Sequence, residues 1–334
     1  MAARRTLSSS NWFDRRQGVT NVRALPRLHI DLPHGLAYDE TQSKNMNMND
    51  PRLKHVQCLD TRDLHRMAYW EWGDEANPRV LVCVHGLSRQ GRDFDTLARA
   101  MSGEYRVVCP DVVGRGQSDS LTDPMGYQIP AYVADMVTLL ARLDAQTVHW
   151  VGTSMGGLIG LGLASLPRSP ISRLVLNDVG PTIQPDALTR IGQYLGAPMR
   201  WSTVDEAADY MLGISKGFGA HSPEQWLALT RPMLKADGDG FKPHYDPNIA
   251  LPFRAITPEM AAFGEAHLWR CFEAIRCPTL LLRGADSDLL THQTAQAMTQ
   301  RGPKAHLVEF TGVGHAPTLV AADQVAVVRE FLLS

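Results

Sequence analysis

A short glycine-containing segment carries the side chain best suited to nucleophilic chemistry. Ser154 lies in Gly152-Thr153-Ser154-Met155-Gly156, a G-x-S-x-G pattern. A strand-like apolar run at 148–151 precedes the pattern, and a helix-like run at 158–166 follows it. A serine on such a sharp turn occupies strained backbone, and the flanking glycines let the strand and the helix approach each other. The pattern therefore predicts that Ser154 is a nucleophile whose hydroxyl is exposed above a sheet edge, beside a helix N-terminus that favours negative charge.

A serine hydroxyl needs a base, and the best candidate is a histidine near the end of the chain. His315 stands in Gly312-Val313-Gly314-His315-Ala316-Pro317, between the last strand-like run and the last helix-like run. An imidazole that is oriented by a carboxylate can take the serine proton and return it to a leaving group. The position of His315 after the last strand indicates that it is this base.

The carboxylate is expected in the segment after the preceding strand, which reads Arg283-Gly284-Ala285-Asp286-Ser287-Asp288-Leu289. Two aspartates compete there. Asp288 precedes two leucines at which the chain turns back toward the sheet, whereas Asp286 is suited to capping the turn. We take Asp288 as the predicted acid and keep Asp286 as the alternative. Nucleophile, acid and base then follow along the chain in the order serine, aspartate, histidine.

Acyl transfer also needs N–H donors for the developing oxyanion, each worth about 3 kcal/mol of barrier in comparable sites. The backbone amide of Met155, the residue after the nucleophile, is one candidate. The other is the amide of Leu87 in His85-Gly86-Leu87-Ser88, directly after the strand-like run at 80–84. We expect His85 to shape this turn rather than to act as a ligand or a base.

Other polar residues are expected to have ordinary roles. Arg89 and Arg92 follow the turn, and we expect them at the surface, with contact to an acidic substrate as the alternative. His221, His244, His292 and His306 show no metal-ligand spacing such as H-E-x-x-H, so the sequence predicts no metal site. The G-x-G-x-x-G pattern of dinucleotide-binding turns is also absent, so the residues predict no such cofactor site.

Together these segments resemble the α/β-hydrolase superfamily. Besides the segments around Ser154, His85 and His315, the run Asp111-Val112-Val113-Gly114-Arg115-Gly116-Gln117-Ser118-Asp119 resembles the D-x-x-G-x-G-x-S loop common in these enzymes. The resemblance covers about residues 60 to 334. It implies a mostly parallel eight-stranded sheet flanked by helices, a helical cap inserted after the sixth strand, and no cofactor. One departure concerns the acid, because many relatives place it three residues after the glycine, where this chain has Ser287.

The apolar pattern independently favours an α/β fold. Strand-like and helix-like runs alternate along the chain, which predicts a mostly parallel sheet with helices on both faces. Between Pro181 and about Cys271 only helical patterns occur, which predicts a cap. The predicted domains are a flexible extension at 1–52, a core at 53–180 and 272–334, and a helical cap at 181–271. Because the cap is rich in Met, Trp and Phe, we expect a largely apolar pocket.

The composition excludes several classes of protein. The 334 residues include 33 basic and 35 acidic side chains, so the chain lacks the positive excess that nucleic-acid binding needs. No run approaches the roughly 18 apolar residues of a membrane span. Five cysteines without paired spacing fit a reducing compartment, and we expect a cytoplasmic protein. The arginine-rich first 30 residues overlap in composition with an organelle transit peptide, but we favour a floppy extension.

These expectations lead to a carboxylesterase-like serine hydrolase. It would cleave an ester or lactone of a small to medium apolar acyl group through an acyl-enzyme, with a small-molecule ester as its partner. A carbon–carbon bond hydrolase, a cofactor-free haloperoxidase or an acyltransferase could use the same triad, because the fold does not fix the bond that is cleaved. A catalytically silent binding protein is the alternative from another class, and the complete Ser/Asp/His set argues against it. We make no prediction of the oligomeric state.

Overall fold

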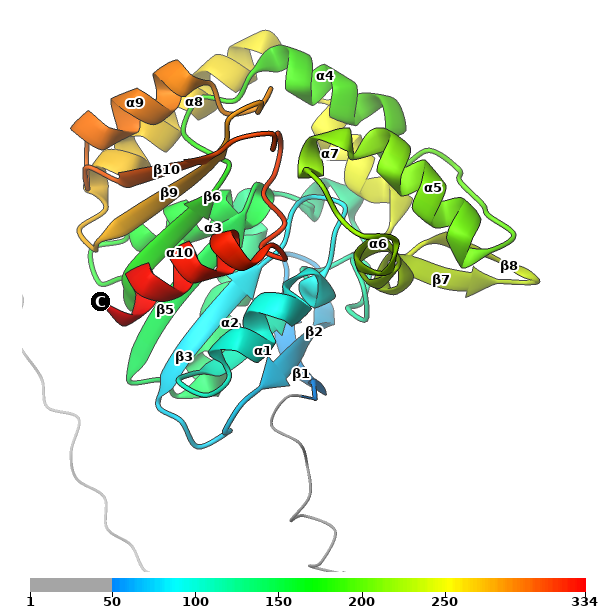
Figure 1. Ribbon diagram of the computed structural model, residues 1–334, viewed down its shortest axis with the longest axis horizontal. Coiled ribbons are helices and arrows are strands. Elements are labelled where there is room, and N and C mark those ends of the chain that lie inside the picture. The colour runs from blue at the N-terminus through cyan, green and yellow to red at the C-terminus, as the bar shows by residue number, and fades with distance from the viewer. Residues whose placement is uncertain (1–49) are drawn as a thin grey trace, which may run out of the picture. The chain divides into compact units, whose positions relative to one another are not determined.

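The computed structural model describes residues 50–334. Within them, eight strands form one sheet with helices packed on both faces (Figure 1). The predicted eight-stranded, mostly parallel sheet flanked by helices is therefore confirmed. The predicted N-terminal extension, with its transit-peptide alternative, lies almost entirely outside the described residues, and the first described strand already begins at Arg52.

The sheet has the strand order β1-β2-β4-β3-β5-β6-β9-β10. β1 pairs with β2 and β2 pairs with β4 in antiparallel fashion, whereas all other neighbours are parallel. Parallel neighbours require crossover connections, which here are mostly helical. The strands are β1 (Arg52–Leu59), β2 (Leu64–Trp72), β3 (Arg79–Val84), β4 (Arg106–Pro110), β5 (Thr147–Thr153), β6 (Ile171–Asn177), β9 (Thr279–Gly284) and β10 (His306–Phe310).

Helices cover the two faces of the sheet. In Figure 1, α1 and α10 lie in front of it, where their apolar side chains join one buried core. Apolar side chains of α2, α3, α8 and α9 join the core on the opposite face. None of the described helices is long and apolar enough to cross a membrane. These helices are α1 (Asp95–Met101), α2 (Ile129–Leu143), α3 (Met155–Ala164), α8 (Pro258–Ala274), α9 (His292–Gln300) and α10 (Ala322–Leu333).

Alternation along β3 shows why its sequence is a continuous apolar run. Leu81 and Cys83 belong to the core beneath α1 and α10, whereas Val80, Val82 and Val84 belong to the core on the other face. All five side chains are fully buried. Strands covered on both faces lose the alternation of polar and apolar residues that marks a half-exposed strand. This burial fixes the carboxyl end of β3, from which the predicted oxyanion turn continues.

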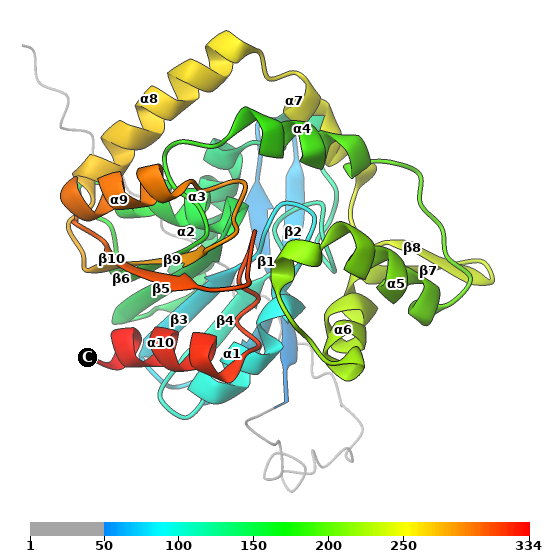
Figure 2. The same ribbon diagram turned by 45° about the horizontal axis from the view of Figure 1, so that its top comes forward.

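Between β6 and β9 the chain leaves the sheet and forms the predicted cap, of which residues 204–243 lie on the right of Figure 1. α8, which follows the cap helices, leads back to the sheet (Figure 2). The cap helices that precede α8 are α4 (Pro185–Tyr194), α5 (Val204–Ile214), α6 (Pro223–Thr230) and α7 (Ala250–Arg254).

The prediction that the cap contains only helices is wrong. β7 (Leu234–Asp237) and β8 (Gly240–Pro243) form an antiparallel hairpin. Gly238 between them has a φ of +60°, a conformation that glycine adopts without strain. The two strands have four residues each and contain no fully buried run, so they lack the pattern that identifies the strands of the sheet.

Candidate active site

Four turns meet at the carboxyl edge of the parallel strands. The turn after β3 carries His85 to Leu87, the turn after β5 carries Ser154, the turn after β6 carries Asp178, and the loop after β10 carries His315. In open α/β sheets this edge is where ligands bind. The structure thus brings together two of the three predicted triad residues with one that the sequence analysis did not select.

The backbone at Ser154 has the strained geometry that the G-x-S-x-G pattern predicts. Its φ of 52° and ψ of −116° lie outside the regions that most L-residues adopt. A Cβ at Gly152 would overlap the carbonyl of Gly156, and a Cβ at Gly156 would overlap that of Val84. Only glycine at both positions allows β5, α3 and the end of β3 to pack this closely.

Ser154, His315 and Asp178 form a hydrogen-bonded chain. Nε2 of His315 lies 3.1 Å from Oγ of Ser154, and Nδ1 lies 2.7 Å from Oδ2 of Asp178. Because a carboxylate accepts hydrogen bonds, Nδ1 carries the proton and the lone pair of Nε2 faces the serine hydroxyl. The Asp178 side chain is fully buried and that of His315 is 13% exposed, so water has little access to the pair. This is the arrangement that a serine nucleophile needs for activation.

The Asp178 carboxylate is held by the strand next to its own. Its Oδ1 accepts a hydrogen bond from the backbone amide of Gly284 at 2.9 Å, and its Oδ2 accepts one from Oγ of Ser287 at 2.6 Å. Its own amide donates to the carbonyl of Leu282 in β9 at 2.8 Å. These bonds orient the carboxylate toward His315.

The prediction that Asp288 orients His315 is wrong. The Asp288 side chain is 50% exposed and forms an ion pair with Arg190, whose Nε lies 2.8 Å away. The alternative, Asp286, is also exposed. Neither contacts the imidazole, because the β6 turn already supplies the carboxylate and Ser287 points its hydroxyl at it. The sequence signal for Asp178 was its position just after a buried strand: the apolar run Leu174-Val175-Leu176 is followed by Asn177 and then by this aspartate.

The two predicted oxyanion donors lie beside the nucleophile. Met155 follows Ser154 and begins α3, and Leu87 lines the same pocket as Ser154. In the part of the chain that the structure describes, no hydrogen bond occupies the backbone N–H of either residue. Free N–H groups beside the nucleophile are what an oxyanion requires, and the role of Leu87 and Met155 stays a prediction.

His85 holds the predicted oxyanion turn in place through two hydrogen bonds, in agreement with the expectation that it shapes this turn. Its Nδ1 donates to the carbonyl of Gly86 at 2.7 Å, and its Nε2 accepts the amide of Val112 at 2.9 Å. Complete burial lowers the pKa of His85 to about 3. The ring is therefore neutral at ordinary pH and connects the turn after β3 to the loop that begins at Asp111.

The loop that begins at Asp111 packs against the predicted oxyanion turn and against the start of α3. Asp111 accepts the backbone amides of Gly91 and Gln117 at 2.7 and 2.8 Å, and burial raises its pKa to about 6. The Arg115 side chain, whose residue is only 1% exposed, donates through Nε to the carbonyl of Leu87 at 2.9 Å. Its Nη2 lies 3.6 Å from Sδ of Met155. Arg115 thus contacts both residues that we expect to bind the oxyanion.

A pocket of about 110 Å³ opens onto Ser154 and His315. Its wall agrees only partly with the expected apolar lining, because charged side chains are also present. Arg89, expected at the surface, instead lines this pocket and pairs with Asp93 at 2.6 Å. The cap and the core together supply the apolar residues Leu87, Phe94, Ile191, Tyr194, Met211, Ile214, Phe218, Leu229, Ala316 and Pro317.

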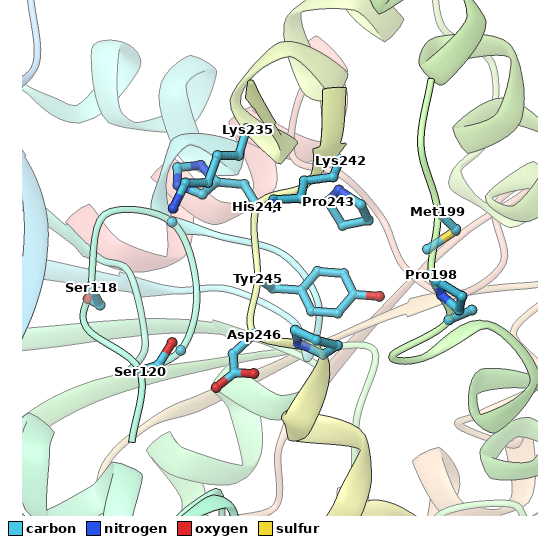
Figure 3. Close-up of a pocket in the computed structure, with 14 residues that line it drawn as sticks. Ser118, Ser120, Pro198, Met199, Lys235, Lys242, Pro243, His244, Tyr245 and Asp246 are labelled. Atoms are coloured by element: carbon cyan, nitrogen blue, oxygen red, sulfur yellow. The ribbon is translucent and has the colours of Figure 1, made fainter. Parts of the chain in front are cut away.

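A second pocket, of about 360 Å³, lies on another side of the Asp111 loop (Figure 3). Ser118 and Ser120 form one wall, and Lys235 and Lys242 of the β7–β8 hairpin lie on another. No triad residue lines it. Although this pocket is larger, the smaller one holds the nucleophile and is the candidate active site.

Among the described residues, one buried group offers potential metal ligands. Cys58, His65 and Asp135 place their ligand atoms within 4.8 Å of one another. Nε2 of His65 is hydrogen-bonded to Asp135 at 3.0 Å. Burial, together with the charge of Asp135, raises the pKa of Cys58 to about 12, which disfavours the thiolate that metals bind. We interpret the group as a structural hydrogen-bond cluster.

Comparison with known proteins identifies the family of this chain. The model of the alpha/beta hydrolase family matches residues 81–328. The chain belongs to the α/β hydrolase family. The expected family and fold are thereby confirmed, as is the expectation of a hydrolase.

Several known proteins are similar to this chain over most of their own length. The 3-hydroxybutyrate-oligomer hydrolase of Cupriavidus necator is 57% identical over 285 residues, which are 84% of this chain and 97% of that protein. The pimeloyl-[acyl-carrier protein] methyl ester esterase of Xanthomonas campestris is 26% identical over 258 residues, which are 74% of this chain and 92% of that protein. A crystal structure of an α/β hydrolase from Novosphingobium aromaticivorans aligns with a TM-score of 0.75 and 34% identity. The alignment covers 85% of this chain and 98% of that chain.

Proposed function

We propose that this α/β hydrolase cleaves carboxylic esters through an acyl-enzyme formed on Ser154. The observation that carries the proposal is the hydrogen-bonded chain from Oγ of Ser154 through His315 to the buried Asp178. The name of the Cupriavidus necator relative points to the same bond type, because oligomers of 3-hydroxybutyrate are joined by esters.

The geometry suggests how each group would act. Nε2 of His315 takes the proton from Ser154 as the serine oxygen attacks the ester carbonyl. The backbone N–H groups of Leu87 and Met155 stabilise the negative oxygen of the tetrahedral intermediate. The imidazolium then protonates the leaving alkoxide, which departs as the alcohol. In the second half, His315 deprotonates a water that attacks the acyl-enzyme, and the acid is released with Ser154 restored.

We propose short linear oligomers of 3-hydroxybutyrate as the substrate. The pocket supports this choice in two ways. Its volume of about 110 Å³ suits a short acyl group rather than a long chain. Its wall combines apolar side chains with Ser215 and Thr318, whose hydroxyls suit the hydroxyl and ester oxygens of such an oligomer.

The experiment compares wild type with Ser154→Ala on the 3-hydroxybutyrate dimer and trimer. p-Nitrophenyl esters of graded acyl length and a vinylogous diketone acid are assayed in parallel. We expect wild type to release 3-hydroxybutyrate, and the variant to lose a factor of about 10⁶ in kcat. Equal rates for the two proteins would overturn the nucleophile assignment. Turnover of the diketone acid without turnover of any ester would replace ester hydrolysis by carbon–carbon bond hydrolysis.

A further inference from the structure

The pocket that opens onto Ser154 has more positive than negative side chains in its wall. Arg89 and Arg190 both line it, whereas Asp93 is its only acidic lining residue among those described. The partner of Arg190 is Asp288, which lies outside the lining. The wall therefore presents one guanidinium whose counter-charge is not part of the pocket.

The two arginines differ in how fully they are engaged. Arg89 holds Asp93 through both Nε and Nη2, donates to the carbonyl of Leu229, and has a side chain only 13% exposed. Arg190 is 38% exposed, and among the residues that the structure describes it has hydrogen bonds only to Asp288, through Nε and one Nη2 proton. A guanidinium has five N–H groups, so Arg190 retains donors for a second acceptor.

The placement of Arg190 suits a group on the substrate rather than a reacting atom. Arg190 lies on α4 of the cap, whereas Ser154 belongs to the turn after β5 at the sheet edge. A linear oligomer of a hydroxy acid carries a hydroxyl at one end and a free carboxylate at the other. Guanidinium groups bind carboxylates in charge-assisted pairs that also fix orientation.

We propose that Arg190 binds the free carboxylate end of the oligoester, so that the enzyme selects short free acids over neutral esters of the same length. This inference rests on the proposed function. Asp288 has two effects on this interaction: it orients the guanidinium, and its negative charge competes with the substrate carboxylate. Arg190 is thus a specificity residue and takes no part in bond cleavage.

The test uses two substrates that differ only in this charge. One is the 3-hydroxybutyrate dimer as the free acid, and the other is the same dimer with a terminal carboxamide. Release of the acyl unit is followed for wild type, Arg190→Gln and Asp288→Asn. Arg99→Gln serves as the control, because Arg99 is exposed, pairs with Asp95 at 3.1 Å and does not line the pocket. It changes the net charge of the protein by the same amount.

We expect Arg190→Gln to lower kcat/KM about tenfold for the free acid and to leave kcat/KM for the carboxamide nearly unchanged. Asp288→Asn should act in the opposite direction and lower the KM for the free acid about two- to fivefold. The control should behave as wild type. These effects should weaken as ionic strength rises, because the arginine is partly exposed.

Two results would overturn the role of Arg190 in binding the carboxylate without contradicting the proposed function. One is that Arg190→Gln changes kcat/KM equally for both substrates, or changes it for neither. The other is that Arg190→Gln and Asp288→Asn change kcat/KM in the same direction for both substrates. The Arg190–Asp288 ion pair would then serve to hold the cap against the core rather than to bind substrate. Failure of wild type to cleave either dimer would instead overturn the oligoester function itself.

Discussion

Nδ1 of His315 lies 2.7 Å from Oδ2 of Asp178, and that same oxygen accepts the hydroxyl of Ser287 at 2.6 Å. The carboxylate therefore extends from the turn after β6 but is oriented by the segment after β9. Because it is fully buried, its attraction to a protonated imidazole is little screened by water. Such a carboxylate holds the ring in one tautomer and stabilises the imidazolium that forms during acyl transfer.

The first prediction concerns this pair. Asp178→Asn should lower kcat on p-nitrophenyl butyrate by about 10⁴-fold with little change in KM, because the amide cannot stabilise the required tautomer. The matched control is Asp286→Asn, an exposed aspartate that does not contact the imidazole. It should retain kcat within about twofold. A similar loss in both variants, or none in Asp178→Asn, would contradict the assignment of the acid.

The second prediction moves the acid to the neighbouring segment. Since Oγ of Ser287 touches the carboxylate that binds His315, a carboxylate at position 287 should reach the same imidazole. We expect Asp178→Asn combined with Ser287→Asp to recover about tenfold or more of the activity lost in Asp178→Asn. Ser287→Asp alone should impair the enzyme, because it buries two carboxylates side by side. Absence of rescue, with the thermal unfolding midpoint of the double variant unchanged from that of Asp178→Asn, would show that position 287 cannot orient His315.

The elements that position the nucleophile could be predicted because their signals are local. The buried strand at 80–84 is a continuous apolar run, and the strand at 148–151 is apolar except for His149. The glycines around Ser154 indicate a close contact of backbone with backbone. β1 could not be recognised in the same way. Its exposed and buried residues alternate only in part, and its pairing with β2 lies along one edge of the sheet.

The acid could not be predicted because its identity depends on a contact between distant segments. Asp178 and His315 are 137 positions apart, and nothing in the sequence around Asp288 reveals that Arg190 takes its carboxylate. The sequence did contain two relevant signs: the serine at 287, where many relatives have the acid, and the aspartate at 178 just after a buried strand. Neither sign shows by itself which carboxylate meets His315, because that contact depends on the fold.

The third prediction concerns Arg115. Its guanidinium binds the carbonyl of Leu87 and lies against Sδ of Met155, and it is buried with no ion pair among the described residues. Arg115→Met should therefore loosen the oxyanion turn and lower kcat about 10- to 100-fold with little change in KM. Arg115→Lys keeps the charge but not the planar fork, and should recover only part of the loss.

The measurement for Arg115 must separate positioning from stability. The rate of Ser154 phosphonylation by a phosphonate ester reports the oxyanion geometry, and the thermal unfolding midpoint reports folding. We expect the phosphonylation rate to fall in step with kcat in the fraction that remains folded. Loss of stability with an unchanged phosphonylation rate per folded molecule would make Arg115 a purely structural residue.

The last prediction follows from the buried histidine of the oxyanion turn. Burial lowers the pKa of His85 from 6.5 to about 3 in the folded protein. Below pH 6.5 the unfolded chain therefore binds a proton that the folded chain refuses, so the stability present above pH 6.5 is lost as the pH falls toward 3. At pH 5 this single group should lower the free energy of unfolding by about 2 kcal/mol relative to pH 8.

His85→Gln tests this linkage because its amide can still accept the hydrogen bond from Val112 but does not titrate. We expect the variant to be less stable than wild type at pH 8, and the gap between them to narrow by about 2 kcal/mol at pH 5. Urea unfolding at the two pH values measures the gap. His306→Gln, a change on an exposed side chain, controls for the loss of one imidazole. A gap for His85→Gln that is the same at both pH values would mean that His85 titrates alike in the folded and unfolded chains, and that burial does not keep its ring neutral.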